Sequence, residues 1–225
     1  MDQTPAHENH NPDLLRIIPQ TSKCIVEVGC SSGALAREFK KLNPETQYIG
    51  IEVDSDYAKL AKRHCDEVHL ANIESMSDAL WGQLSQADCW IFGDTLEHLQ
   101  NPWQVLRKIR SLIGPNGVIA CCIPNAQHWS LQVKLSIGEF RYESSGLLDK
   151  THLRWFTRKT LIELFYDSGF DILEIHPRIF NEPGRDGFLC LLQRVAKRAG
   201  ANSEEAINDA IPLQYTLLAK PVKRE

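Results

Sequence analysis

Cys24–Gly33 (CIVEVGCSSG) joins an apolar run to a glycine-rich turn, and Tyr48–Asp54 (YIGIEVD) places an acid at the end of a second apolar run. β-Branched side chains dominate the first run, which predicts a buried strand bounded by a tight turn. Apolar residues at helical spacing predict that a helix over Ser32–Leu42 follows this turn. A strand, a turn, a helix and another strand are the beginning of a parallel sheet.

The alternation of apolar runs with segments of helical period continues along the chain. It predicts an α/β protein with a doubly wound, mainly parallel sheet and helices on both faces. Such sheets bind ligands at the carboxyl ends of their central strands. Strands are expected over Cys24–Val28, Tyr48–Val53, Glu67–Ala71, Cys89–Phe92, Val118–Ile123, Phe170–Ile175 and Tyr215–Ala219. Further helices are expected after Asp54, over Pro102–Ile113, after Thr157 and near Phe188–Arg198.

Composition and charge narrow the class of protein. The chain has 225 residues, of which 43% are hydrophobic and 24% charged, and its net charge is -4. These values fit one globular domain over residues 14–225 behind a polar arm at residues 1–13, expected to be either mobile or a lid over a ligand. The negative balance disfavours a nucleic-acid binder. No apolar run is long enough to span a membrane, and the amino terminus lacks the order of a signal peptide.

The cysteines point to a reducing compartment. Seven are present, and none forms a C-x-x-C pair, which disfavours a zinc ribbon or a thioredoxin-like site. Several lie within apolar runs, where a free cysteine acts as a small hydrophobic residue. We therefore expect reduced cysteines in the core of a cytoplasmic protein.

The glycine turn and the acid after the second strand together indicate a nucleoside ligand. Glycines let backbone N–H groups approach a ligand at the start of a helix. Glu52 follows Gly33 by about 20 residues, a spacing at which a carboxylate accepts hydrogen bonds from a ribose. Ser31 stands where a nicotinamide-binding loop needs a glycine beside the pyrophosphate, so this loop favours a different adenosine ligand.

These motifs resemble, in order and along nearly the whole chain, those of class I S-adenosylmethionine-dependent methyltransferases. The resemblance implies a Rossmann-like sheet of seven strands with an antiparallel last strand, and S-adenosylmethionine as the cofactor. It implies that Glu52 binds the ribose and that Val53 lies beside the adenine. It also implies that Asn72 accepts a hydrogen bond from the adenine amino group and that the backbone of Ile73 meets a ring nitrogen. The other cofactor residues implied are Glu27, Gly29, Cys30, Ser31, Gly33 and Asp94.

The segment over residues 124–158 contains PNAQHW and GLLDKTHLRWFT. It resembles a branch of small methyltransferases associated with sugar and cell-surface polysaccharide biosynthesis and, more distantly, MetW-like proteins of methionine biosynthesis. We therefore expect the methyl acceptor to bind here, although surface arginines and core aromatics are the alternative interpretation. The expected acceptor contacts are Asn125, Arg141, Tyr142 and Arg154, with Arg158 as a further anion-binding residue and Trp129 and Trp155 as further stacking faces.

A hydroxyl acceptor loses a proton when it is methylated, so a general base is expected. His152 in KTHLR is the first candidate, and His128 after Pro124 is the second. The alternative for each is a histidine that orders the backbone around it or packs in the core. Asp94, at the carboxyl end of the fourth strand, is the third expected catalytic residue, facing the sulfonium, the acceptor or a cation.

Asp94–His98 (DTLEH) leaves two interpretations open. Asp94, Glu97 and His98 resemble the metal-binding residues of ubiquinone-pathway O-methyltransferases, and such donors suit Mg²⁺, Mn²⁺ or Zn²⁺. The L-E-H string also occurs in metal-independent relatives, where its role is structural. We expect no metal and keep the cation site as the alternative.

Two functions fit these patterns. The first is S-adenosylmethionine-dependent methylation, expected on an oxygen of a sugar, a saccharide or another small-molecule biosynthetic intermediate, by a monomer or a homodimer. The second is a non-catalytic, S-adenosylmethionine-binding partner of a biosynthetic enzyme, as the MetW-like resemblance implies.

Overall fold

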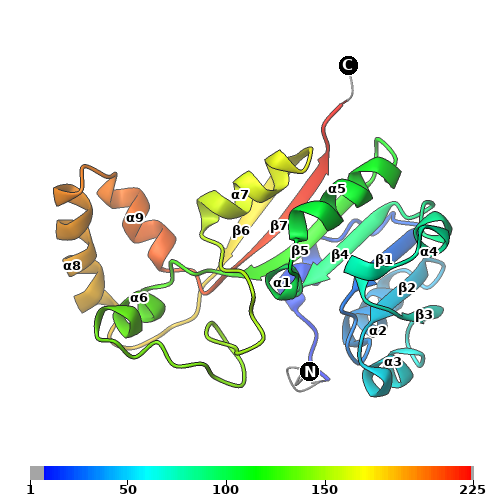
Figure 1. The fold of residues 1–225 in the computed structure, drawn as a ribbon, viewed down its shortest axis with the longest axis horizontal. Coiled ribbons are helices and arrows are strands. Elements are labelled where there is room, and N and C mark those ends of the chain that lie inside the picture. Colours follow the sequence, from blue (N-terminus) through cyan, green and yellow to red (C-terminus); the bar gives the residue numbers. More distant parts are fainter. Residues whose placement is uncertain (1–7, 224–225) are drawn as a thin grey trace.

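The computed structural model describes residues 8–223, so the first seven residues of the expected polar arm lie outside the described residues. The strands are β1 (Cys24–Val28), β2 (Gln47–Glu52), β3 (Glu67–Leu70), β4 (Cys89–Gly93), β5 (Val118–Pro124), β6 (Phe170–Arg178) and β7 (Gln214–Pro221). They form one sheet in the order β3-β2-β1-β4-β5-β7-β6 (Figure 1). β1 to β5 pair in parallel, and β7 runs antiparallel to β5 and β6. The predicted seven-stranded, mostly parallel sheet with an antiparallel last strand is confirmed.

The strand order reverses beside β1, because the chain moves outward through β2 and β3 and then returns to β4 on the other side of β1. A reversal of this kind opens a crevice at the carboxyl ends of the two central strands. The loops that follow β1, β2 and β4 therefore meet at one edge of the sheet, as the sequence predicts.

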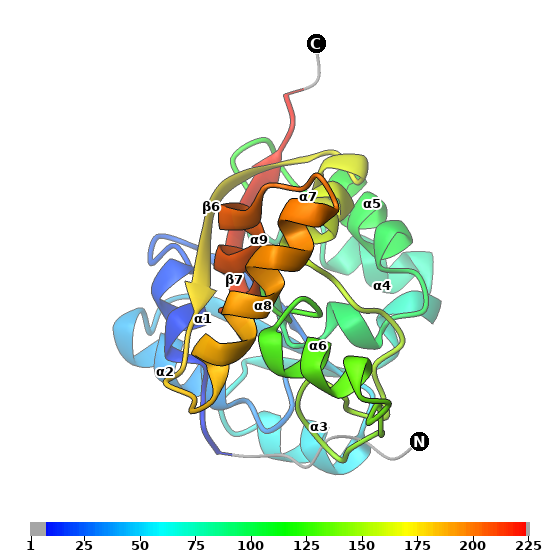
Figure 2. The same cartoon turned by 90° about the vertical axis from the view of Figure 1, so that its left-hand side faces the viewer.

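Helices cover both faces of the sheet (Figures 1 and 2). On one face, Leu14 and Phe39 pack with the strand residues Ile25 and Tyr48 in one buried cluster. On the other face, aromatic and aliphatic side chains such as Trp81 belong to a second cluster. The helices of the first face are α1 (Pro12–Ile17), α2 (Ala34–Leu42) and α3 (Ser55–Ala61), and those of the second are α4 (Asp78–Gln83), α5 (Pro102–Leu112) and α7 (Arg158–Asp167).

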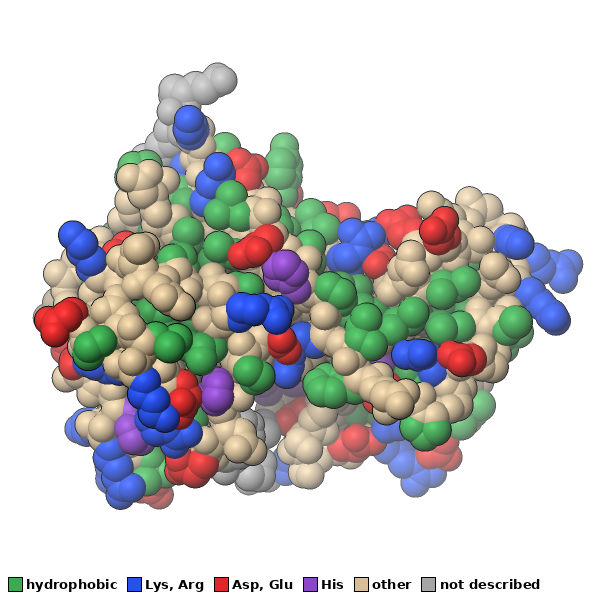
Figure 3. All heavy atoms as spheres, turned by 180° about the vertical axis from the view of Figure 1, so that it is seen from behind, with side chains coloured by type: hydrophobic (Ala, Val, Ile, Leu, Met, Phe, Trp, Pro, Cys, Tyr) green, Lys and Arg blue, Asp and Glu red, His purple; other side chains and the backbone are tan. Residues whose placement is uncertain are grey.

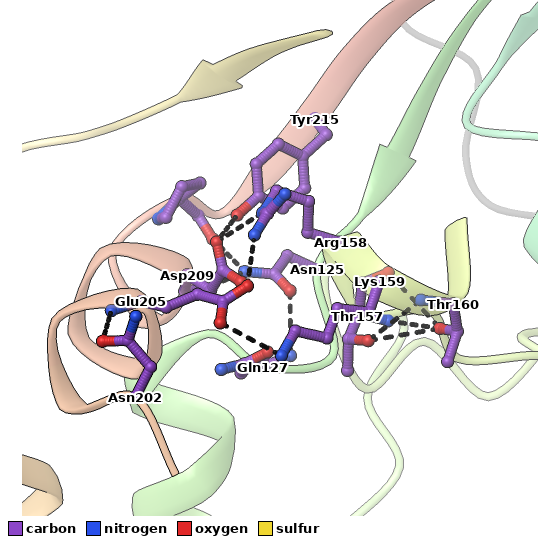
Figure 4. A network of polar contacts seen from close by, with 11 residues as sticks. Asn125, Gln127, Thr157, Arg158, Lys159, Thr160, Asn202, Glu205, Asp209 and Tyr215 are labelled. Atoms are coloured by element: carbon purple, nitrogen blue, oxygen red, sulfur yellow. Dashed lines mark hydrogen bonds and ion pairs between the residues drawn. The ribbon is translucent and has the colours of Figure 1, made fainter. Parts of the chain in front are cut away.

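Three helices form a separate group beyond one end of the sheet (Figures 1 and 2). They are α6 (Trp129–Ser136), α8 (Arg185–Arg198) and α9 (Ser203–Ala210). Arg158 at the start of α7 donates hydrogen bonds to Asp209 at 2.6 Å and to Glu205 at 2.9 Å (Figure 4). The Asn125 amide donates to the carbonyls of Asp209 and Pro212, at 2.8 Å each. These bonds fix α9 against the sheet, so the group has a defined position.

The expected strands and all five expected helices are found, with small shifts at their ends. Thr157 caps α7 in a capping box, because its hydroxyl accepts the Thr160 N–H and the Thr160 hydroxyl accepts the Thr157 N–H. The helix expected from Ser32 begins instead at Ala34, since Gly33 adopts a positive φ of 80° before it. The helices that the sequence did not predict are α1, α4, α6 and α9, which have six to eight residues each. Too few turns repeat in such helices for an apolar period to stand out.

None of the helices within residues 8–223 has the length and apolar character that crossing a bilayer requires. Six of the cysteines are buried, as expected, whereas Cys190 on α8 is exposed. Seen from behind, exposed hydrophobic side chains gather over the part of the molecule that holds α8 (Figure 3). On α8 itself, Leu191 and Val195 are exposed by 55% and 54%.

Candidate active site

The loop after β1 has the backbone shape that the glycines predict. Gly29 and Gly33 adopt φ values of 71° and 80°, and Ser31 between them also lies in the left-handed region at 49°. A Cβ on Gly29 would lie 2.8 Å from the Thr95 hydroxyl. Glycine at position 29 is therefore required both by its φ and by the close approach of the chain after β4. The Cys30 side chain is buried away from the loop surface, beside Gly50 of β2.

Glu52, at the end of β2, connects the two central loops. Its carboxylate accepts hydrogen bonds from the N–H groups of Ser31 at 2.8 Å, Val53 at 2.8 Å and Asp54 at 3.0 Å. The side chain is buried. A carboxylate has about four acceptor positions, so a ribose hydroxyl would share this carboxylate with the backbone. Glu52 thus shapes the glycine loop as well as offering an acceptor to a ligand.

Glu27 lies inside β1, behind the loop. The hydroxyl of Tyr48 on β2 donates a 2.9 Å hydrogen bond to its carboxylate. Burial raises the pKa of Glu27 from 4.5 to about 8, against the lowering effect of the Tyr48 hydrogen bond and with a smaller raising effect of Glu52. In the folded protein at neutral pH, the Glu27 carboxyl group therefore favours its uncharged form.

The residues expected around adenine lie next to each other along the sheet edge. Val53, directly after β2, exposes 54% of its surface, an unusual fraction for a valine beside a core strand. Asn72 caps a short 3₁₀-helix, η1 (Ile73–Ser75), by accepting the Glu74 N–H at 2.9 Å. Ile73 is buried. An exposed apolar face beside an amide and a backbone turn is a suitable surface for an adenine ring.

A second group of polar residues gathers after β4, where the 3₁₀-helix η2 (Leu96–His98) contacts the segment Asp149–Arg154. The Glu97 carbonyl accepts the N–H groups of Leu153 and Arg154, at 2.8 and 2.9 Å. These bonds bring Glu97 and His98 to His152, and one potential ligand atom from each of the three lies within 4.8 Å of the others. We call these residues the Glu97–His98–His152 cluster.

The partners of His98 determine which of its ring nitrogens carries the proton. His98 Nδ1 lies 3.2 Å from the Thr151 carbonyl oxygen and 3.0 Å from the Thr151 hydroxyl. The carbonyl can only accept, and the hydroxyl donates its own proton to Asp149 at 2.7 Å. Nδ1 of His98 therefore carries a proton, and Nε2 is the ring nitrogen left for another partner.

Burial changes the ionisation of the other two members of the cluster. Burial, and then the neighbouring His98, lower the pKa of His152, so this histidine is neutral at pH 7. Burial raises the pKa of Glu97 well above its usual range, and nearby Asp94 raises it further. Neither carboxylate oxygen of Glu97 accepts a hydrogen bond from another described residue.

Asp94 is near Glu97 but is not one of the three residues of this cluster. It has a positive φ of 52°, is exposed, and accepts a hydrogen bond from the Gln214 side-chain amide. The fold brings His152 to Glu97 and His98, a contact that the sequence could not reveal because His152 lies far along the chain. The alternative cation site of Asp94, Glu97 and His98 stays a prediction.

Two other predicted site residues, His128 and Asn125, are buried. His128 is buried at the start of α6, with Nδ1 2.8 Å from the Ser130 hydroxyl and Nε2 3.1 Å from the Glu182 carboxylate. Burial lowers the pKa of His128, which the attraction of Glu182 partly offsets. Asn125 is also fully buried, and its amide hydrogens go to the carbonyls described above. The catalytic role of His128 and the acceptor contact of Asn125 stay predictions.

The three arginines of the expected anion site differ in their partners. Arg158 is paired with Asp209 and Glu205, as shown in Figure 4. Arg154 donates to the carbonyls of Leu153 and Gln100. Arg141 forms a 2.6 Å ion pair with Glu139 on the surface, where 80% of its side chain is exposed. Arg141 and Arg154 therefore stay candidates for an anion, whereas Arg158 supports the fold.

Aromatic rings extend from the cluster to the surface. The ring centroids of His152 and Trp155 lie 6.5 Å apart, those of Trp155 and Phe140 6.3 Å, and those of Phe140 and Tyr142 6.1 Å. Trp155 and Phe140 are each 38% exposed and Tyr142 is 63% exposed. We call Phe140, Tyr142 and Trp155 the aromatic row. Phe140 was not among the predicted residues; its place in GEFRY, beside Arg141 and Tyr142, is the signal that could have indicated it.

Comparison with known proteins gives the family. Residues 8–175 match the family model of a methyltransferase domain. Among curated proteins, none matches this chain by sequence. Solved structures share its fold at low sequence identity. One, from the complex of the Haloferax volcanii Trm112 methyltransferase activator and a methyltransferase, is 13% identical with a TM-score of 0.62, over 94% of this chain and 88% of that one.

Two further structures have the same fold. A methyltransferase of Thermotoga maritima, described as a possible histamine N-methyltransferase, is 15% identical with a TM-score of 0.61, over 92% of this chain and 84% of that one. The plantazolicin methyltransferase BpumL, in complex with S-adenosylhomocysteine, is 15% identical with a TM-score of 0.59, over 90% of this chain and 77% of that one. With the sheet order and the glycine loop, the family match shows that the chain belongs to the methyltransferase domain family, as an S-adenosylmethionine-dependent methyltransferase.

Proposed function

We propose that this methyltransferase methylates a hydroxyl group of a sugar, a saccharide or a related small-molecule intermediate. The observation that carries the proposal is the aromatic row, which begins next to His152 and continues to the surface. Exposed aromatic faces in a row bind the apolar faces of sugar rings while leaving the hydroxyl groups free for hydrogen bonds. A saccharide held on this row would extend from the surface to the Glu97–His98–His152 cluster.

The methyl donor is proposed to occupy the crevice beside β1. The loop from Gly29 to Gly33 would carry the methionine part, and Glu52 would accept a hydrogen bond from the ribose. Adenine would cover the exposed side chain of Val53, with Asn72 and the backbone of Ile73 at its edge. Burying the exposed part of one valine contributes about 1 kcal/mol to binding.

The reaction is a displacement at the methyl carbon. The acceptor oxygen forms a bond to this carbon as the bond from carbon to the sulfonium sulfur breaks, and S-adenosylhomocysteine leaves with the electron pair. The acceptor's hydroxyl proton must pass to the protein or to water. The lowered pKa of His152, caused first by burial and then by His98, keeps this ring neutral at pH 7, the form that accepts a proton. Orientation of the two substrates supplies much of the remaining rate enhancement.

The names of the structural neighbours do not favour one acceptor class. One is named for plantazolicin and another for histamine, so the acceptor proposal rests on the residues of this chain alone. Arg141 and Arg154 lie on the acceptor-side segment, and they favour an acceptor with a phosphate or carboxylate group.

A second candidate function is a partner protein that binds S-adenosylmethionine and regulates a biosynthetic enzyme. The observation that favours it is the exposed apolar surface of α8 at Leu191 and Val195, since exposed apolar patches mark interaction sites. One structural neighbour comes from a complex with a methyltransferase activator. In this function, α8 would contact the enzyme, and no methyl group would be transferred to a saccharide.

The two functions are separated by a transfer assay with methyl-deuterated S-adenosylmethionine and a panel of saccharides and sugar nucleotides. We expect one acceptor to gain a deuterated methyl group on oxygen, with an equal amount of S-adenosylhomocysteine formed. Each acceptor is tested with and without a phosphate group, because Arg141 and Arg154 favour the charged form. No labelled product on any saccharide, combined with retained binding of S-adenosylhomocysteine, would contradict the acceptor proposal and leave the partner function.

A further inference from the structure

We propose that the Glu97–His98–His152 cluster is a binding site for a divalent cation of the Zn²⁺ type. Glu97 is 1% exposed, and neither of its oxygens accepts a hydrogen bond from another described residue. A buried carboxylate without donors is costly. Two imidazoles face this carboxylate, with His152 Nε2 4.0 Å from Glu97 Oε1. A cation between the three side chains would satisfy the carboxylate.

His98 is oriented as histidine ligands are in known metal sites, and His152 is packed against it. In such sites, the ring nitrogen that does not bind the metal donates to a carbonyl or a carboxylate, which fixes the ring. His98 Nδ1 donates to the carbonyl and the hydroxyl of Thr151, which leaves Nε2 for a cation. The ring of His152 packs edge-on against that of His98, with 4.8 Å between their centroids, and its Nε2 lies 4.0 Å from Glu97 Oε1. One hydrogen-bonded ring and one packed ring thus bring a nitrogen of each histidine to the same carboxylate.

The spacing suits a tetrahedral ion after small side-chain movements. The ligand atoms lie within 4.8 Å of one another, whereas bonds of about 2.0–2.1 Å in a tetrahedron place ligands roughly 3.3 Å apart. Closing this difference requires movement of about 1 Å or less toward a common centre. Glu97 can make this movement without breaking a hydrogen bond to another residue, because its oxygens make none.

The donor set determines the class of cation. Two imidazole nitrogens and one carboxylate suit Zn²⁺ and similar transition metals, whereas Mg²⁺ and Ca²⁺ prefer oxygen ligands throughout. Three protein ligands leave one tetrahedral position open. If the proposed function holds, this position is where the acceptor hydroxyl would coordinate and become more acidic. His152 would then be a metal ligand and the cation would take over the role expected of a free base.

Binding would also tie two segments together. Glu97 and His98 belong to η2, whereas His152 belongs to the segment that carries Thr151 and leads into the aromatic row. Without a cation, the two segments are joined by the hydrogen bonds that the Glu97 carbonyl accepts from the N–H groups of Leu153 and Arg154. A cation would add a bond between side chains at the same junction, so its binding would raise the unfolding temperature.

The test is calorimetric titration of Zn²⁺ into the full chain after dialysis against a chelator. Cys190→Ser serves as the background, because Cys190 is an exposed thiol and thiolates are zinc ligands. We expect one equivalent to bind and the unfolding temperature to rise, with no displacement by excess Mg²⁺. Thr151→Val, which removes one anchor of His98, should weaken binding about 10–100-fold. His98→Ala and His152→Ala should weaken it further.

The matched control is His176→Ala, since His176 is 41% exposed and paired with Glu174 away from the cluster. Its zinc affinity should equal that of the background protein. Equal zinc affinity in the background protein and in folded His98→Ala and His152→Ala would overturn the proposal, as would the absence of zinc binding. The readout is independent of methyl transfer: a protein that methylates a saccharide without binding zinc contradicts the cation site alone, and one that binds zinc here without any saccharide product contradicts the proposed function alone.

Discussion

The hydroxyl of Tyr48 donates a 2.9 Å hydrogen bond to the carboxylate of Glu27, and the two residues lie on adjacent central strands beneath the glycine loop. Both side chains are buried. The pair holds an ionisable group in the core at the place where the proposed cofactor site begins. Its energetic consequence is a dependence of stability on pH.

Glu27 should make the protein less stable as the pH rises. Because its pKa is raised from 4.5 to about 8, the folded state binds a proton that the unfolded state has released between these values. The contribution of this bound proton to the free energy of unfolding is complete below pH 4.5. It is lost as the pH rises to about 8, at up to about 1.4 kcal/mol per pH unit. Glu27→Gln keeps an acceptor for Tyr48 and removes the titration.

Urea unfolding between pH 5 and pH 8, without cofactor, measures this effect. We expect the stability of the wild type to fall relative to that of Glu27→Gln across the range. Parallel stability curves for the two proteins would show that Glu27 does not titrate in the core.

Gly29→Ala should destabilise the protein by about 1–3 kcal/mol, because position 29 has a φ of 71° and a Cβ would lie 2.8 Å from the Thr95 hydroxyl. Gly187→Ala is the matched control. Gly187 lies in α8 without positive φ, and a Cβ there meets no atom within 4 Å. This variant should be as stable as the wild type or more stable by up to about 1 kcal/mol. Similar melting temperatures for both variants would contradict the constraint at Gly29.

The sequence predicts the part of the fold in which local pattern and long-range packing agree. The apolar runs of β1, β2, β4 and β5 are visible in the chain because these strands are buried on both faces. The turn at Gly29 is visible because its backbone angles favour glycine. The helices α6 and α9 are not visible, because they are short and depend on contacts with α8 and the Arg158–Asp209 pair.

In the candidate site too, the sequence predicts single residues, whereas the contacts between distant residues appear only in the fold. Glu52 was predicted at the end of its strand, yet its three backbone hydrogen bonds depend on how the loops after β1 and β2 fold together. The contact of His152 with Glu97 joins residues far apart in the chain. A local motif could offer Asp94 as a neighbour of Glu97, but only the fold shows that His152 joins Glu97 and His98.

Arg158→Ala should cost about 2 kcal/mol of stability. Arg158 pairs at 2.6 Å with Asp209, whose side chain is 6% exposed, and removal of one partner leaves a buried carboxylate without its charge partner. Lys159→Ala is the control, because the Lys159 side chain is 61% exposed and its pair with Glu205 spans 3.2 Å. We expect a change below about 0.5 kcal/mol for this variant. Equal unfolding free energies for the two variants would contradict a supporting role for the Arg158 pair.

Trp155→Ala should raise the KM for a saccharide acceptor about 10-fold and change kcat less, because in the proposed function the aromatic row would bind the sugar ring away from the reacting atoms. Tyr166→Ala on α7 is the control, since Tyr166 is 72% exposed and lies outside the row. Steady-state kinetics with the acceptor found in the transfer assay give both values. A KM unchanged by Trp155→Ala would exclude Trp155 from acceptor binding.

The most direct test of the central claim, that the loops after β1 and β2 hold the cofactor, is calorimetric binding of S-adenosylhomocysteine to the wild type, Val53→Asp, Glu52→Ala and Val195→Asp. Val53 and Val195 are both 54% exposed, so the same substitution is made at the proposed adenine site and on α8. We expect Val53→Asp to weaken binding about 10-fold, Glu52→Ala to weaken it by at least as much, and Val195→Asp to bind as the wild type does. Equal affinities of wild type, Val53→Asp and Glu52→Ala, all folded by circular dichroism, would contradict the site.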